Sequence, residues 1–183
     1  MSRGRDERWS DATQALALRA AVATDDQALA AWRELTERVN IAALDDPELD
    51  RLLPLVWRHL GEQVGPVHLS LLKGRYREAW VQNQHHLHHA SELVSRLAAE
   101  GIDSLLLKGL PVALLYYDDL GARPMTDVDL LVRPDQAVSA WRLLEGLGYE
   151  TTSIRGPDPS RWEQEGDDDW YRRLRHARGF VRG

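Results

Sequence analysis

The spacing of apolar residues changes at Gly101, and this change constrains the fold more than any other feature of the sequence. From about Ser10 to about Glu100, leucine, alanine and tryptophan recur three and four residues apart, which is the period of an α-helix. After Gly101 the apolar residues come in short runs separated by glycine, proline and charged residues. We therefore expect a helical region over residues 1–100 and a region of strands and helices over residues 101–183.

Some features of the helical region can be located more closely. Asp45 or Asp46, just ahead of Pro47 in DDPELDRLLPLVWRHL, is suited to cap a helix there, and Pro54 is expected to kink or restart that helix. The longest helix is predicted over residues 69–99, and Gly101 ends it. The core is expected to hold most of the tryptophans, among them Trp32, Trp57, Trp80 and Trp141.

The second region is predicted to alternate between strands and helices. The predicted order is a strand in IDSLLLKG, a short helix in LPVALLYYDDL opened by its proline, a strand in VDLLV, a helix in PDQAVSAWRLLEGLG and a strand over residues 149–154. The residues after the turn-rich RGPDPS are predicted to be helical. This order indicates an α/β or α+β fold.

Composition limits the chemistry of the chain. Its 183 residues include no cysteine, which excludes disulfides, a thiolate nucleophile and cysteine-ligated zinc. A formal charge of −6 disfavours a broad nucleic-acid surface. No apolar run is long enough to span a membrane and no secretory signal is recognisable, so we expect a cytoplasmic protein with no membrane partner.

Two acids in DVDLLV are the strongest indication of chemistry. Alternate residues of a strand share a face, so Asp127 and Asp129 are predicted to point the same way. Two carboxylates at such a short distance repel one another unless a cation lies between them. Mg²⁺ fits best, because it combines one or two carboxylates with water and substrate phosphates. The alternative is structural: Asp127 turns the chain and pairs with Arg123, and Asp129 lies at a solvated strand edge.

Lys108 and Gly109 stand between the first predicted strand and the helix after it. A glycine there lets the backbone turn sharply and expose amide groups, and Lys108 adds a mobile positive charge, so together they are suited to bind a phosphate. From this dipeptide alone, an ordinary strand-to-helix turn with a surface lysine is the simpler interpretation.

The run QHHLHH places His85, His88 and His89 three and four residues apart on a helix. This spacing can hold zinc or nickel, and a polar helix face is the alternative. The motifs of serine hydrolases, P-loop proteins and dinucleotide-binding proteins do not occur in the sequence.

Taken together, LLLKGLPVALLYYDDLGARPMTDVDLLV resembles the nucleotidyltransferase superfamily typified by DNA polymerase β, in which a glycine turn after the first strand precedes a D-x-D strand. It is more closely similar to an uncharacterised bacterial nucleotidyltransferase family with LKG, LY and GxRPxxDxDLLV segments and a helix that ends in GY. These pieces stand here as Leu107-Lys108-Gly109, Leu115-Tyr116, Gly121 to Val132 and Gly148-Tyr149. The resemblance covers residues 101–150 strongly and the helical half more loosely, through LLPLVWRHL.

The resemblance implies an α+β fold, with a helical N-terminal half followed by a minimal nucleotidyltransferase core that has a mixed β-sheet. It implies that Asp127 and Asp129 are catalytic and bind Mg²⁺, that Gly109 frames the triphosphate, and that Lys108 and Arg123 hold phosphates. The reaction would be attack by an acceptor hydroxyl on the α-phosphate of a nucleoside triphosphate, with a small molecule, peptide or protein as acceptor.

One departure from the family pattern concerns a third carboxylate. The superfamily usually completes its site with an acid on a later strand. No such strand is recognised after Tyr149, where Asp167, Asp168 and Asp169 are typical of a helix start. We therefore expect an incomplete core, truncated before the third acid and with an unpaired sheet edge.

Three hypotheses about function stay open at this point. The first is a nucleotidyltransferase whose third acid is supplied from elsewhere. The second is a catalytically inactive nucleotide-binding or protein-interaction module that retains the fold. The third is a helical adaptor in which the D-x-D is only structural.

Overall fold

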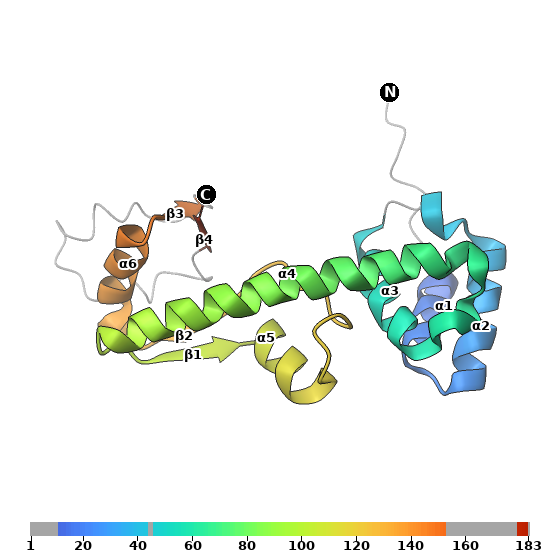
Figure 1. The fold of residues 1–183 in the computed structure, drawn as a ribbon, viewed down its shortest axis with the longest axis horizontal. Coiled ribbons are helices and arrows are strands. Elements are labelled where there is room, and N and C mark those ends of the chain that lie inside the picture. Colours follow the sequence, from blue (N-terminus) through green and yellow to red (C-terminus); the bar gives the residue numbers. More distant parts are fainter. Residues whose placement is uncertain (1–10, 44–45, 153–178, 183) are drawn as a thin grey trace, which may run out of the picture. The chain divides into compact units, whose positions relative to one another are not determined.

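The computed structural model describes residues 11–43, 46–152 and 179–182, and Figure 1 shows the order of their elements. The fold is α+β with a helical N-terminal half, which confirms the predicted class. The chain divides into two compact units, Met1–Ala90 with Leu107–Asp129 and Ser91–Leu106 with Leu130–Gly183. Each unit is made of two separate segments of the chain. The two regions expected from the sequence were instead continuous, residues 1–100 and 101–183.

Helices α1 (Asp11–Val22), α2 (Asp25–Arg38), α3 (Pro47–Leu60) and α4 (Pro66–Ala99) come first, with short 3₁₀ turns η1 (Ile41–Ala43) and η2 (Gly61–Val64) between them. Figure 1 shows α1, α2 and α3 gathered beside the N-terminal part of α4. Their side chains form one apolar core that includes Trp32, Leu35 and Leu72. The indole Nε1 of Trp32 donates a hydrogen bond to Val64 O at 3.4 Å, so the buried ring also satisfies its polar atom.

Helix α3 is capped at its start by Asp46. The Asp46 side chain accepts hydrogen bonds from the backbone N–H groups of Glu48 at 2.8 Å and Leu49 at 3.2 Å. Pro54 does not restart the helix, which continues to Leu60. Pro54 is itself buried, and its packing against the core offsets the backbone hydrogen bond that a proline cannot donate.

The first unit also contains the segment after β1. It forms α5 (Gly109–Val112), which continues into the π-helical stretch η3 (Ala113–Tyr117). The sequence predicted that this short helix starts at Pro111. It begins two residues earlier, at Gly109. Proline is tolerated throughout the first turn of a helix, because the N–H groups of that turn have no partner within the helix.

The second unit begins with the end of α4. Gly101 has φ = 70°, and the N–H of Ile102 donates to Leu97 O at 2.9 Å, so the predicted glycine stop is confirmed. The elements that follow are β1 (Ser104–Leu107), β2 (Asp129–Val132), η4 (Pro134–Gln136), α6 (Ala137–Gly146), β3 (Tyr149–Thr152) and β4 (Gly179–Arg182). Leu97, Ile102 and Ala140 form the buried centre of this unit.

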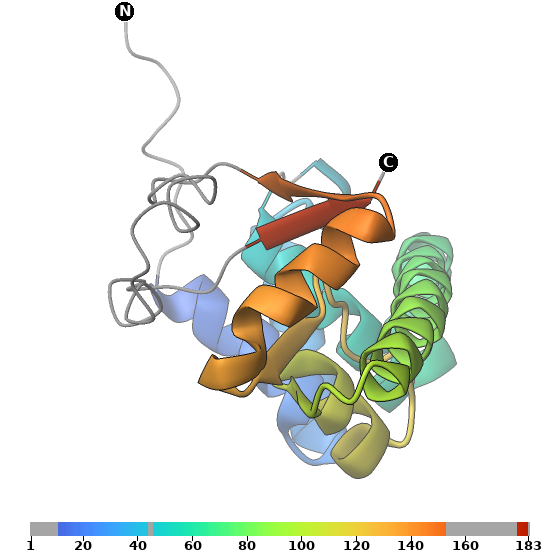
Figure 2. The same ribbon diagram turned by 90° about the vertical axis from the view of Figure 1, so that its left-hand side faces the viewer.

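The described strands form two pairs. β1 pairs with β2, and β3 pairs antiparallel with β4, with Tyr149 opposite Arg182 and Thr152 opposite Gly179. Figure 2 shows the β3–β4 pair beside α6. The single mixed sheet expected from the resemblance is not formed within residues 11–43, 46–152 and 179–182, where the strands make two separate two-stranded sheets.

Strand β4 corrects the prediction that the C-terminal residues are helical. Its sequence GFVR is extended because its backbone groups pair with β3, and it contains an aromatic and a β-branched residue that favour strands. It carries no carboxylate. Asp167, Asp168 and Asp169, with the helix start predicted there, lie outside the described residues.

Of the four tryptophans in the described residues, three lie in or against a core, as predicted, and one does not. Trp32 and Trp141 are buried and Trp57 packs at the edge of the core, but the Trp80 side chain is exposed. The buried face of α4 is carried by Ala79 and by residues at helical spacing from it, and Trp80 points away from that face. No helix in the described part of the chain has the length and apolarity needed to cross a membrane.

Candidate functional site

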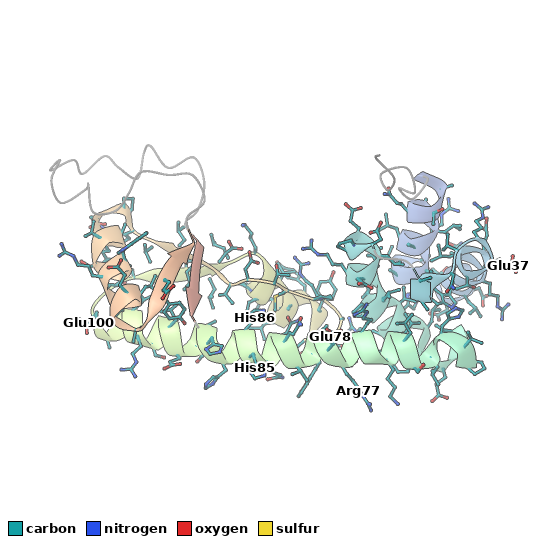
Figure 3. All side chains as sticks on the ribbon, turned by 90° about the horizontal axis from the view of Figure 1, so that it is seen from above. Glu37, Arg77, Glu78, His85, His86 and Glu100 are labelled. Carbon is teal, nitrogen blue, oxygen red and sulfur yellow. The ribbon has the colours of Figure 1, made fainter. Side chains whose placement is uncertain are left out.

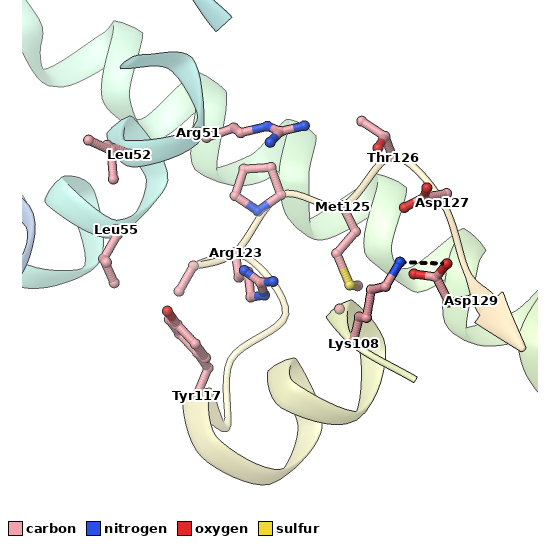
Figure 4. A pocket seen from close by; sticks show the side chains of 13 residues that line it. Arg51, Leu52, Leu55, Lys108, Tyr117, Arg123, Met125, Thr126, Asp127 and Asp129 are labelled. Atoms are coloured by element: carbon pink, nitrogen blue, oxygen red, sulfur yellow. Dashed lines mark hydrogen bonds and ion pairs between the residues drawn. The ribbon is translucent and has the colours of Figure 1, made fainter. Parts of the chain in front are cut away.

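The first unit contains a cavity of about 310 Å³. Its lining includes all five residues singled out from the sequence: Lys108, Gly109, Arg123, Asp127 and Asp129 (Figure 4). Helix α3 also contributes to the wall. The fold therefore brings together residues that lie up to 21 positions apart in the candidate motif, as in the contact between Lys108 and Asp129.

The two acids lie at the start of β2 and just before it, so the prediction that both belong to the strand is correct for Asp129 and wrong for Asp127. Asp129 is the first residue of β2, and Asp127 lies two residues earlier and is exposed. The Asp129 side chain is 22% exposed, and its Oδ1 accepts a hydrogen bond from Lys108 Nζ at 3.1 Å. The described residues contain no ion pair between Asp127 and Arg123, so the pairing expected in the structural alternative is not formed.

Lys108 has an unusual backbone conformation. Its φ of 54° and ψ of −112° are rare for a residue with a side chain and cost about 1–3 kcal/mol. The strained turn directly precedes Gly109, where a Cβ atom would lie 2.8 Å from Met125 Sδ. The glycine leaves room for the Met125 side chain, which would have to shift to accommodate a larger residue.

Two guanidinium groups at the cavity, those of Arg51 and Arg123, form no ion pair with an acid among the residues that the structure describes. Arg123 Nε is buried and makes no hydrogen bond within the described residues. Arg51, from α3, also lines the cavity and has no ion pair in the described part of the chain. Unpaired guanidinium groups are suited to bind phosphate or carboxylate oxygens. The sequence pattern drew attention to Arg123 and missed Arg51, because nothing in α3 marks its exposed arginine as different from any other.

Helix α4 holds the loop that carries Arg123 and the acids. Asn83 is fully buried, and its Nδ2 donates to Leu120 O at 2.6 Å and Arg123 O at 2.7 Å. His86 Nε2 donates to Met125 O at 3.2 Å. Since these residues stand three apart, they share one helix face. The signal that could have revealed Asn83 is a polar residue on the otherwise apolar buried face of α4.

Asp119 forms a second set of contacts at the start of the same loop. Its Oδ1 accepts hydrogen bonds from Tyr76 OH at 2.9 Å and from the Gly121 N–H at 2.8 Å, and its Oδ2 lies 3.3 Å from Arg58 Nε. Burial of the ring raises the pKa of Tyr76 above its usual value, and the hydrogen bond to Asp119 raises that pKa further. The loop is thus tied to α4 by a tyrosine that stays neutral.

The histidine run does not form a metal site in the structure. His85, His88 and His89 are exposed, and the described residues hold no group of three or more histidine, aspartate or glutamate side chains that could bind a metal ion. Figure 3 shows His85 and His86 on different faces of α4. His86 instead supports the loop, so the polar-face alternative holds for its neighbours.

A cavity with two carboxylates, a lysine and two arginines that have no acidic partner among the described residues is the kind of site that proteins use to bind phosphorylated substrates. The chain belongs to a nucleotidyltransferase family: it matches the family model described as "Uncharacterised nucleotidyltransferase" over residues 48–181. This range contains both acids and most of α3. No curated protein and no solved structure matches the chain.

Proposed function

We propose that the chain is a magnesium-dependent nucleotidyltransferase that moves a nucleotide from a nucleoside triphosphate to a hydroxyl-bearing acceptor. The supporting observation is that Asp127, Asp129, Lys108 and Arg123 line one cavity. The chain that carries them belongs to a nucleotidyltransferase family. A helical adaptor with a structural D-x-D does not account for this grouping.

The residues present fit magnesium. Asp127 and Asp129 offer carboxylate oxygens from two positions on one cavity wall, and Mg²⁺ commonly takes one or two carboxylates and completes its shell with water and phosphate oxygens. Bound there, Mg²⁺ would neutralise phosphate charge and stabilise pyrophosphate as the leaving group. The Lys108 ammonium already compensates one of these carboxylates, since it lies 3.1 Å from Asp129 Oδ1.

The remaining side chains serve to position the triphosphate. Lys108 and Arg123 would bind phosphate oxygens, and Gly109 leaves room for the triphosphate beside the turn. In the reaction, the acceptor oxygen forms a bond to the α-phosphorus and the bond from that phosphorus to the β-phosphate oxygen breaks. Pyrophosphate leaves, and the hydroxyl proton passes to solvent or to a carboxylate.

The acceptor is proposed to be a small molecule, a peptide or a protein. Nucleic acid is not proposed, because the net charge of −6 gives no broad basic surface. A cytoplasmic location and the relation to the DNA polymerase β superfamily stay predictions from the sequence.

A second candidate is a nucleotide-binding module without turnover. The observation that favours it is that the cavity lining contains two carboxylates, and the described residues supply no third one there. Such a module would bind the same nucleotide with the same residues. Only a measurement of product separates the two functions.

The proposal is tested by calorimetric titration of the whole chain with ATP, with and without Mg²⁺. We expect binding that depends on Mg²⁺ and is lost when Asp127→Asn and Asp129→Asn are combined. Asp118→Asn is the matched control, because Asp118 is exposed, close in sequence and absent from the cavity lining. Binding that is absent, or equal in the double variant, would overturn the proposal. Pyrophosphate release with candidate acceptors then distinguishes the transferase from the module.

A further inference from the structure

The cavity has two chemically different ends. Asp127, Asp129 and Lys108 lie at one end, whereas Leu52, Leu55 and Tyr117 lie at the other (Figure 4). The end formed by the two leucines and the tyrosine, here called the α3 end, is largely apolar. Neither the D-x-D strand nor the lysine and glycine turn accounts for it.

Helix α3 presents a defined face to this end. Leu52 and Leu55 stand three residues apart, and Arg51 stands four before Leu55, so all three share one side of the helix. The adjacent side carries the buried residues Leu49, Leu53 and Val56, and Leu52 and Leu55 are themselves partly buried and pack against the same core of the first unit. The position of the apolar wall is therefore set by core packing, which keeps it rigid.

The two tyrosines at the end of η3 have different environments. Tyr117 is half-buried and lines the cavity, and its ring is directed toward Leu55 (Figure 4). Tyr116, its neighbour, is 81% exposed and does not line the cavity. One aromatic face and two aliphatic side chains are thus available to a flat apolar group at the α3 end.

We infer that the α3 end binds the base of the nucleoside triphosphate, with the ring of Tyr117 against one face of the base and the side chains of Leu52 and Leu55 closing the site. This inference rests on the proposed function, because the phosphates then lie toward Lys108 and the acids. Arg51 extends from α3 toward Thr126 and Asp127 (Figure 4), so its guanidinium group would face the polyphosphate of a nucleotide bound in this way. The helical region consequently supplies part of the substrate site.

The α3 end also determines how strongly one base is distinguished from another. Discrimination between bases requires several placed donors and acceptors, and the Tyr117 hydroxyl is the polar group that the two leucines and this tyrosine offer. Stacking alone is tolerant of base identity and grows with ring area. We expect purine nucleotides to bind several-fold more tightly than pyrimidine nucleotides, and ATP and GTP to differ by less than about tenfold.

Calorimetry of the whole chain in Mg²⁺ tests the inference, with ATP, GTP, CTP, UTP and inorganic tripolyphosphate as ligands. We expect ATP to bind at least about tenfold more tightly than tripolyphosphate. Tyr117→Ala should weaken ATP binding about tenfold and leave tripolyphosphate binding unchanged, while Tyr117→Phe should retain the affinity for ATP. Tyr116→Ala is the matched control and should bind both ligands as the wild type does.

Two results would overturn the inference while leaving the proposed function in place. One is equal affinity for ATP and tripolyphosphate, and the other is an equal loss of both in Tyr117→Ala. If Tyr117→Ala fails to fold, Leu55→Ala is measured in the same way. Its affinities for ATP and for tripolyphosphate are each compared with those of the wild type. If neither ATP nor tripolyphosphate binds, the proposed function and this inference fall together.

Discussion

Gly121 and Gly74 have opposite surroundings in the same unit. A Cβ atom on Gly121 would overlap the ring of Tyr76, whereas one on Gly74, in α4, would meet nothing within 4 Å. The ring of Tyr76 is held by its hydrogen bond to Asp119 and cannot move freely. Gly121 in the GxRP segment is therefore required by the close approach of loop and helix.

We predict opposite effects when each of these glycines is replaced by alanine. Gly121→Ala should lower the free energy of unfolding by about 1–3 kcal/mol, because it forces Tyr76 off its hydrogen bond. Gly74→Ala should raise that free energy by about 1 kcal/mol, since alanine favours a helix interior. Urea unfolding followed by circular dichroism measures both, and equal midpoints for the two variants would contradict the prediction.

Tyr76 should also make stability depend on pH in the alkaline range. Its pKa is raised in the folded state above the usual 10.0, first by burial and then by the hydrogen bond to Asp119. A raised pKa favours the neutral form, so this contribution to stability is fully present below about pH 10 and is lost as the pH rises through the folded-state pKa. The pH dependence can be measured as the melting-temperature difference between wild type and Tyr76→Phe.

That difference should be constant up to about pH 10 and should change above it in the direction that disfavours the wild type. Phenylalanine cannot ionise, so the variant serves as the reference at each pH. A difference that stays constant to pH 11 would show that Tyr76 titrates alike in the folded and unfolded states.

At the scale of elements, α4 is both a core helix and the support of the candidate site. Its buried face continues through Asn83, whose amide bonds two loop carbonyls, and His86 bonds a third. Helical periodicity predicted α4 correctly to within a few residues, but it does not show which loop packs on the helix. The contact of Asn83 with Leu120 and Arg123 spans more than 35 positions in the chain.

Asn83→Leu is predicted to destabilise the chain by about 1–3 kcal/mol, because it leaves the carbonyl groups of Leu120 and Arg123 without their donor. It should also weaken ATP binding, since the backbone position of Arg123 is no longer held. Gln82→Leu is the matched control: Gln82 is exposed on the same helix, and its replacement should change stability by less than about 0.5 kcal/mol. Thermal unfolding and calorimetry provide the two measurements, and identical behaviour of the two variants would contradict a supporting role for Asn83.

At the scale of the whole molecule, the candidate site is not contained in residues 101–183. The cavity is lined by Arg51, Leu52 and Leu55 from α3, and the loop that carries the acids is held by α4. We predict that a fragment of residues 101–183 shows no cooperative thermal unfolding and does not bind ATP, because it lacks these supports. The whole chain is the control, and a fragment that melts cooperatively and binds ATP would show that the second region folds and functions alone.

The sequence by itself determined what depends on local chain properties. The helical half, the glycine stop at Gly101, the Asp46 cap and the strands that contain Leu106 and Leu130 follow from side-chain period and backbone preference, which act over a few residues. The motif likewise marked Lys108, Gly109, Arg123, Asp127 and Asp129, all of which line the cavity. These features are local because capping, turning and alternation are decided by neighbours in the chain.

The tertiary structure decided everything that depends on which distant segments meet. The strand β4 exists because β3 is there to pair with it, and the roles of Asn83, Tyr76 and Arg51 arise from contacts with segments far away in sequence. An exposed arginine or a buried asparagine has no local property that names its partner. The apolar end of the cavity is therefore visible only when α3 and η3 are seen together.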